Sequence, residues 1–158
     1  MPQSRFSVER SLTIPAPESR IFPLLADFHE WQKWSPWEGL DPQLHREYDG
    51  PPSGVGARYS WSGNRKAGSG SMEIQEAHEP SDLRIRLVFV KPWKADNQTT
   101  FELRPVGDQT RVTWRMNGTS AGVASVFGKL FNMDKLVGGD FEKGLAKLSA
   151  QVREQPTG

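Results

Sequence analysis

Two polar residues that could do chemistry, Glu76 and His78, lie at the end of an alternating segment. Met72 and Ile74 are apolar positions of one parity, and Glu76 and His78 continue that parity. Successive side chains of a strand point to opposite faces, so both residues could point inward. Burial there would raise the pKa of Glu76 and let it act as a base or orient a hydroxyl. The alternative is that both side chains lie in water at the strand end.

Metal, thiol and dinucleotide chemistry have no support in the sequence. His29, His45 and His78 lie in different predicted elements, without the short spacing of a metal site. The absence of cysteine excludes thiol nucleophiles, disulfides and thiolate zinc sites. Gly68–Ser71 is not a nucleophile elbow, and Gly54–Gly56 lacks the third glycine of a dinucleotide loop. We therefore predict neither a metal nor a cofactor.

The composition is that of a folded protein with large aromatic side chains. Hydrophobic residues make up 35% of the chain, and six Trp and eight Phe add a large apolar area per residue. Lys and Arg total 20 against 19 Asp and Glu, with no clustered basic surplus, so we predict no nucleic-acid partner. No apolar run approaches the ~18 residues of a membrane helix, so we predict no membrane insertion. The start lacks a signal-peptide core, and we expect a cytoplasmic protein.

Alternation of apolar and polar residues predicts seven strands with one buried face each. The segments are Phe6–Ile14, Leu44–Tyr48, Ala57–Ser62, Met72 up to Pro80, Leu83–Val90, Thr99–Leu103 and Thr110–Asn117. The last six follow one another closely. Short connections favour antiparallel neighbours, because parallel pairing needs a crossover of a dozen or more residues.

Two short helices are predicted between the first two strands, and one long helix at the C-terminus. Pro17–Glu18 suits a first helical turn, and Phe28–Lys33 forms the second helix. The last third has apolar residues every three or four positions, which predicts one face of a long helix. These residues are Val126, Leu130, Met133, Val137, Phe141, Leu145, Leu148 and Val152.

Two positions interrupt these patterns. Gly138 and Gly139 lie within the long helix and would permit a bend or a close backbone approach, or act as a hinge. Arg10 falls on the buried side of the first strand. A bulge, an arginine near the open edge of the sheet, and a buried cation serving an acidic ligand all remain open for Arg10.

The predicted order of strands and helices, together with several motifs, resembles the START-like superfamily, also called SRPBCC. The likeness is to its polyketide cyclase/dehydrase and lipid-transport-like members. The matching residues are Ile14-Pro15-Ala16-Pro17, Trp31-Gln32-Lys33-Trp34-Ser35-Pro36-Trp37, Gly54-Val55-Gly56-Ala57, Trp61-Ser62-Gly63-Asn64, Lys91-Pro92, Thr110-Arg111-Val112-Thr113-Trp114, Met133-Asp134-Lys135 and Phe141-Glu142-Lys143-Gly144-Leu145. The likeness runs from about Phe6 to Val152 and is greatest to uncharacterised bacterial members.

The resemblance implies an α+β helix-grip fold, in which a seven-stranded antiparallel sheet wraps the long C-terminal helix around a ligand cavity. We expect one domain over residues 1–158, with an ordered core from about residue 6 to residue 152. The resemblance does not imply one reaction, because superfamily members bind different ligands and only some do chemistry.

Three functions follow as hypotheses. The first is binding of a small hydrophobic molecule, such as a lipid, quinone or polyketide, by a monomer or homodimer. The second is a cyclase or dehydratase that uses the same cavity, with Glu76 and His78 as the catalytic candidates. The third is a protein-interaction module that uses a surface patch of Trp31, Trp34 and Trp37. The predicted ligand-binding residues are Trp34, Trp37, Tyr48, Tyr59, Trp61, Met72, Phe89, Phe101, Trp114, Phe127, Leu130 and Phe131. For each aromatic residue the alternative is plain core packing.

Overall fold

A computed structural model describes residues 4–35, 43–64, 68–91, 95–120 and 133–154. The strands are β1 (Ser4–Ile14), β2 (His45–Asp49), β3 (Arg58–Ser62), β4 (Ser69–His78), β5 (Asp82–Lys91), β6 (Ala95–Val106) and β7 (Gln109–Ser120). The helices are α1 (Glu18–Ala26), the 3-10 helix η1 (Glu30–Lys33) and α3 (Met133–Glu154). This order confirms the predicted strands, the two short helices and the C-terminal helix from Met133 onward. Val126 and Leu130, which were predicted for the start of that helix, lie outside the described residues.

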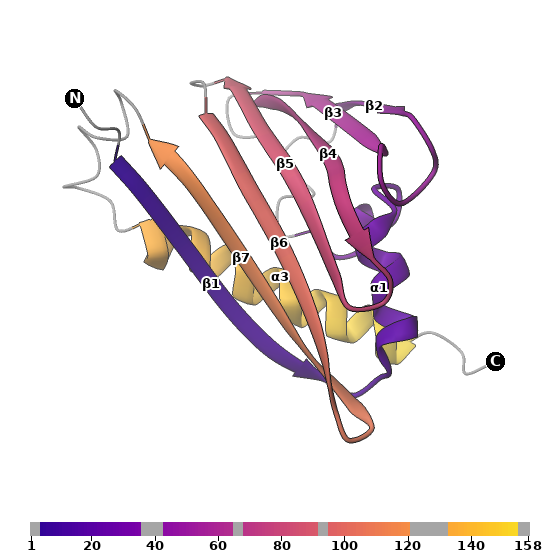
Figure 1. Cartoon of the computed structure of the whole chain (residues 1–158). Coiled ribbons are helices and arrows are strands. Elements are labelled where there is room, and N and C mark those ends of the chain that lie inside the picture. The colour runs from indigo at the N-terminus through magenta and orange to yellow at the C-terminus, as the bar shows by residue number, and fades with distance from the viewer. Residues whose placement is uncertain (1–3, 36–42, 65–67, 92–94, 121–132, 155–158) are drawn as a thin grey trace.

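All seven strands form one antiparallel sheet in the order β1-β7-β6-β5-β4-β3-β2. The sheet is strongly twisted, and α3 lies across one of its faces. Helix α1 lies beside the C-terminal end of α3 (Figure 1). We call the face toward α3 the inner face and the opposite one the outer face. The helix-grip α+β class predicted from the sequence is therefore confirmed.

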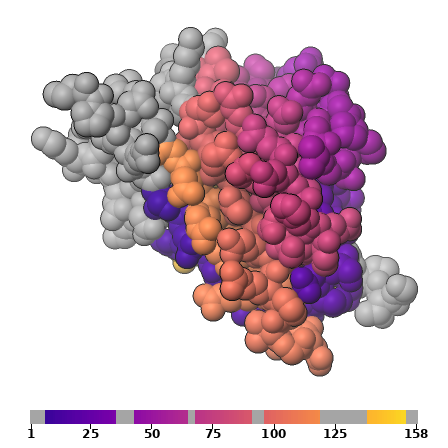
Figure 2. Space-filling model, viewed as in Figure 1, coloured from indigo at the N-terminus to yellow at the C-terminus, as the bar shows by residue number. Residues whose placement is uncertain are grey.

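The outer face carries the polar positions of the strands. Arg115 on β7 donates to Glu9 on β1 at 2.6 Å and to Glu102 on β6 at 3.2 Å. Arg86 on β5 makes two hydrogen bonds to Asp96, which lower the pKa of that carboxyl. Figure 2 views the molecule from this side, where the side chains of β4 to β7 form a continuous surface. Cross-strand pairs of this kind support the antiparallel register.

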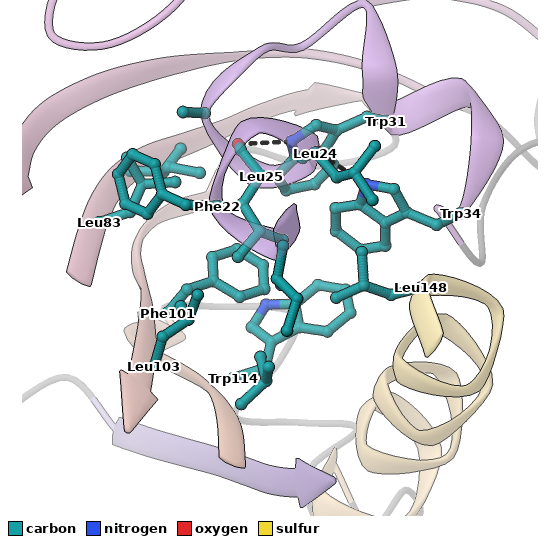
Figure 3. Packing of buried hydrophobic residues seen from close by; sticks show 14 of the residues in the cluster. Phe22, Leu24, Leu25, Trp31, Trp34, Leu83, Phe101, Leu103, Trp114 and Leu148 are labelled. Carbon is teal, nitrogen blue, oxygen red and sulfur yellow. Dashed lines mark hydrogen bonds between the residues drawn. The ribbon is translucent and has the colours of Figure 1, made fainter. Parts of the chain in front are cut away.

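The inner face, α1, η1 and α3 enclose a core that contains three buried tryptophans, Trp31, Trp34 and Trp114 (Figure 3). The indole N–H of Trp31 donates to the Leu25 carbonyl, and that of Trp34 donates to the Leu24 carbonyl, both at 2.9 Å. These carbonyls belong to the last turns of α1, where helical carbonyl groups lose their partners within the helix. Trp31 and Trp34 therefore fasten η1 to the C-terminal end of α1.

Helix α3 packs through one apolar face, and glycine lets it approach β1. Phe141, Leu145, Leu148 and Val152 are at most 1% exposed, as their spacing predicts. A Cβ atom on Gly138 would lie 2.5 Å from Cζ of Arg10, which is too close for two carbon atoms. The close approach expected at the glycine pair is confirmed at Gly138.

Arg10 causes no bulge in β1. The pairing of β1 with β7 is one-to-one from Ser4 to Ile14, so the bulge considered for Arg10 is wrong. Its guanidinium lies against α3, where Nε donates to Glu142 at 3.3 Å and Nη1 donates to the Glu9 carbonyl at 2.7 Å. The side chain is 27% exposed, so this ion pair is partly solvated.

Candidate functional site

A row of half-buried aromatic rings crosses the inner face from β2 to β5. Tyr48 and Tyr59 have ring centroids 5.1 Å apart, and the rings of Tyr59 and Trp61 stack at 6.0 Å. Trp61 meets Phe89 edge-on at 5.8 Å. All four pack against the core, yet each keeps part of its surface accessible. We call these four residues the aromatic row.

A glycine on β4 gives the Trp61 ring its place on the sheet. Gly70 is the register partner of both Trp61 on β3 and Phe89 on β5. A Cβ atom at Gly70 would lie 2.7 Å from Cη2 and 2.9 Å from Cζ2 of Trp61, and would also meet the Val88 carbonyl oxygen. Glycine in a strand often marks a position where another group approaches the backbone closely. The indole of Trp61 therefore lies over the backbone of β4.

Tyr48 is held at the other end of the aromatic row by the chain around η1. The imidazole of His29 stacks on its ring with centroids 3.9 Å apart. The Gln32 side-chain amide donates to the Tyr48 hydroxyl at 2.7 Å. The hydroxyl can still donate a hydrogen bond of its own.

Two buried polar side chains of β6 lie beside the aromatic row. Asn97 and Thr99 are each 3% exposed, and they have the inward parity of Phe101 on the same strand. Neither Oδ1 of Asn97 nor Oγ1 of Thr99 has a hydrogen-bond partner in the described part of the chain. Buried polar atoms nearly always have a partner, so two unpaired atoms two residues apart need an explanation.

The register partners of Asn97 and Thr99 on β5 are apolar. Asn97 is the register partner of Leu87, Leu87 is paired with Met72, and Met72 is paired with Tyr59 of the aromatic row. Thr99 is paired with Ile85 on one side and Met116 on the other. Met72, which was predicted as a ligand residue, lies between Leu87 and Tyr59 in the sheet and is 8% exposed.

Asn97 and Thr99 were not among the site residues predicted from the sequence. The signal for Asn97 was its parity with Phe101 and Leu103. The predicted strand began only at Thr99, whereas β6 begins at Ala95. Following the alternation back by two residues would have placed Asn97 on the inner face.

Three of the predicted ligand residues lie instead in the closed core. Trp34 and Phe101 are 0% exposed and Trp114 is 1% exposed. Trp114 stacks on Phe141 of α3 with centroids 4.0 Å apart, and Phe101 and Trp34 meet its ring at 5.0 and 5.5 Å. Their rings fill the space between the middle of the sheet and α3, as plain core packing requires. Their burial agrees with core packing, the alternative given for each aromatic residue.

The inward orientation considered for Glu76 and His78 is wrong. The register between β4 and β5 shifts between Ile74 and Glu76, so the inward parity passes from Glu76 to Ala77, which packs against the core. A bulge of this kind reverses the facing of every later residue in the strand. Glu76 and His78 are exposed, which agrees with the alternative interpretation of strand-end residues in water.

Both side chains have partners on the outer side. Glu76 forms an ion pair with Arg84 of β5. His78 Nδ1 lies 2.7 Å from Oδ1 of Asp82, and this contact raises the pKa of the imidazole.

The tryptophan patch considered for protein binding is also wrong for two of its three members. Trp31 and Trp34 are 5% and 0% exposed, because each satisfies its N–H inside the core. Trp37, and the predicted ligand residues Phe127, Leu130 and Phe131, lie outside the described residues.

Two further properties concern the described residues alone. They contain no group of three or more His, Asp or Glu side chains that could hold a metal ion. They also contain no helix that is long and apolar enough to cross a membrane.

The family described as "Polyketide cyclase / dehydrase and lipid transport" matches residues 5–153. The chain belongs to this family. No curated protein matches the sequence.

Solved structures with the same fold cover nearly the whole chain. Norcoclaurine synthase from Thalictrum flavum, in complex with dopamine and hydroxybenzaldehyde, has a TM-score of 0.73 at 10% identity, covering 99% of this chain and 91% of its own. Protein CV1439 from Chromobacterium violaceum has a TM-score of 0.68 at 14% identity, covering 94% and 98%. The Mll3558 protein from Rhizobium loti has a TM-score of 0.62 at 22% identity, covering 93% and 99%.

At these identities the neighbours establish the fold and nothing finer. The START-like superfamily predicted from the sequence motifs is confirmed by the family match and by the shared architecture. The ligand and any reaction have to be argued from the residues of this chain.

Proposed function

We propose that this protein binds a small, mostly apolar molecule on the inner face of its sheet, over the aromatic row. One observation carries the proposal: the aromatic side chains of the core and the inner face divide into a fully buried set and an accessible set. Trp34, Phe101 and Trp114 are fully packed, whereas the four rings of the aromatic row keep accessible surface. Adjacent aromatic rings left accessible on a sheet face are typical of a binding surface.

The arrangement of the aromatic row supports this function. Trp61 lies over Gly70 of β4, and Tyr48 is held by His29 and Gln32. Rings held in place in this way lose little conformational freedom when a ligand packs on them, and such preorganisation favours binding.

The enzymatic alternative loses its named candidates. Glu76 and His78 are on the solvent side and are paired with Arg84 and Asp82. The proposal therefore assigns ligand binding to the inner face and assigns no catalytic residue.

The test compares Trp61→Ser with Val106→Ser by calorimetric titration of a hydrophobic probe, 8-anilinonaphthalene-1-sulfonate. Val106 is 52% exposed at the β6–β7 hairpin, so its change removes an accessible apolar side chain away from the aromatic row. We expect wild type and Val106→Ser to bind the probe alike. Trp61→Ser should bind it about 2–10-fold more weakly, since an aromatic contact contributes roughly 0.5–1.5 kcal/mol.

The far-UV circular dichroism of all three proteins should be the same, which shows that the sheet is intact. Probe binding by Trp61→Ser with wild-type affinity would place the binding surface elsewhere and refute the proposal. The absence of binding in wild type, repeated with a fatty acid and a quinone, would refute it as well.

A further inference from the structure

The unpaired polar atoms on β6 specify which apolar molecules would suit this face. We propose that the ligand carries a hydroxyl group that hydrogen-bonds to the side chain of Asn97, with Thr99 as a second polar contact. The preferred ligand class is a neutral hydroxylated apolar molecule, such as a phenol or a fatty alcohol. This inference rests on the proposed function and adds to it the polar group that the site selects.

Two buried oxygen atoms of β6 lack hydrogen-bond partners among the described residues. Oδ1 of Asn97 and Oγ1 of Thr99 are buried, and the described part of the chain gives them no hydrogen bond. Thr110, at the far end of the same face, shows how this protein treats a comparable buried hydroxyl. Its Oγ1 donates to the Ala16 carbonyl at 2.7 Å. A buried acceptor without a donor is unfavourable, so a ligand that supplies the donor gains affinity over one that does not.

The chemistry of these atoms determines which partner they can accept. An amide oxygen only accepts hydrogen bonds, so a carboxylate or a ketone cannot satisfy it. A hydroxyl donates and accepts, so it also suits Asn97 if the amide is turned to present its nitrogen. The register neighbours of Asn97 and Thr99 on β5 are Leu87 and Ile85, which supply no charge for an ionised ligand. A neutral hydroxyl therefore fits better than an acid.

The distance between Asn97 and the aromatic row determines the size of ligand that can contact both. Phe89 and Ala95 are register partners, and Asn97 is two residues beyond Ala95 on the same face of β6. Two residues along a strand span about 6.5 Å and neighbouring strands lie about 4.8 Å apart, so the Cα atoms of Phe89 and Asn97 are about 8 Å apart. A ligand with one or two rings, or a short alkyl chain, can therefore lie on Phe89 and Trp61 while its hydroxyl reaches Asn97.

The experiment compares two probes that differ only at the oxygen atom. 4-Pentylphenol can donate a hydrogen bond, whereas 4-pentylanisole keeps the oxygen as an acceptor but has no O–H. Calorimetric titration of wild type should show about 5–10-fold tighter binding of the phenol, the usual effect of one hydrogen bond to an otherwise unpaired buried group. Asn97→Leu should reduce this preference to less than about twofold, and Thr99→Val should reduce it in part.

Thr100→Val is the matched control, because Thr100 lies on the opposite face of the same strand. It should keep the full preference for the phenol. If Asn97→Leu fails to fold, Thr99→Val decides the question, since valine has nearly the shape of threonine.

The outcomes separate this inference from the proposed function. Equal binding of both probes by wild type would overturn the hydroxyl contact, because ordered water would then satisfy the two atoms. The proposed binding of an apolar molecule would be unaffected by that result. A phenol preference that survives in both Asn97→Leu and Thr99→Val would also overturn the hydroxyl contact. Binding of neither probe would refute the proposed function itself.

Discussion

Replacing Thr99 with valine should stabilise the ligand-free protein, although the change is made in its core. Thr99 is 3% exposed and its hydroxyl has no partner among the described residues. An unpaired buried polar group costs roughly 1–3 kcal/mol, and burying a methyl group in its place contributes about 0.8 kcal/mol. We expect a net increase of about 1–2 kcal/mol in the free energy of unfolding, near the lower end of these two contributions combined.

Thr110 provides the control with the opposite sign. It is 0% exposed on the adjacent strand β7, but its Oγ1 donates to the carbonyl of Ala16, which is itself buried. Thr110→Val removes that bond and leaves the carbonyl unpaired, so it should lower the free energy of unfolding by about 1–3 kcal/mol. The same substitution in the same sheet is thus expected to act in opposite directions.

Urea denaturation followed by far-UV circular dichroism measures both changes. The slope with denaturant should not change, so that the midpoint reports stability alone. Thermal melting should show an increase of about 2–8 °C for Thr99→Val. If Thr99→Val destabilises the protein as much as Thr110→Val does, the Thr99 hydroxyl has a partner in the free protein, and the argument for a vacant hydrogen-bond position fails.

Two further predictions concern α3 and the β4–β5 turn. Gly139→Ala should raise the free energy of unfolding by about 0.5–1 kcal/mol, because its Cβ meets no atom within 4 Å and alanine favours the helix. Gly138→Ala should gain less or lose stability, since its Cβ would displace the Arg10 guanidinium; equal gains in chemical denaturation would contradict the close approach. The pKa of His78 should lie above its ordinary value in an NMR titration and return toward it in Asp82→Asn, because the Asp82 carboxylate favours the imidazolium. The associated stability is present below the unfolded pKa of about 6.5 and is lost as pH rises through the folded value, so an unshifted His78 would show that the contact is absent in solution.

Local patterning determined most of the architecture of this protein. The alternation in Leu83–Val90 predicted β5, and the three-to-four spacing from Phe141 to Val152 predicted the packed face of α3. These patterns are readable because a strand repeats every two residues and a helix every 3.6 residues, whatever the partner element. The START-like motifs likewise indicated the superfamily from the sequence alone.

Only the tertiary structure decided which side chains could meet a ligand. The register shift after Ile74 turned Glu76 toward water, and it depends on how β4 pairs with β5. Trp34 is buried and donates its N–H to the Leu24 carbonyl, whereas Trp61 lies on β3, the strand next to the sheet edge, and keeps part of its surface accessible. Sequence periodicity states which face a residue occupies, but accessibility and hydrogen-bond pairing depend on atoms distant in the chain.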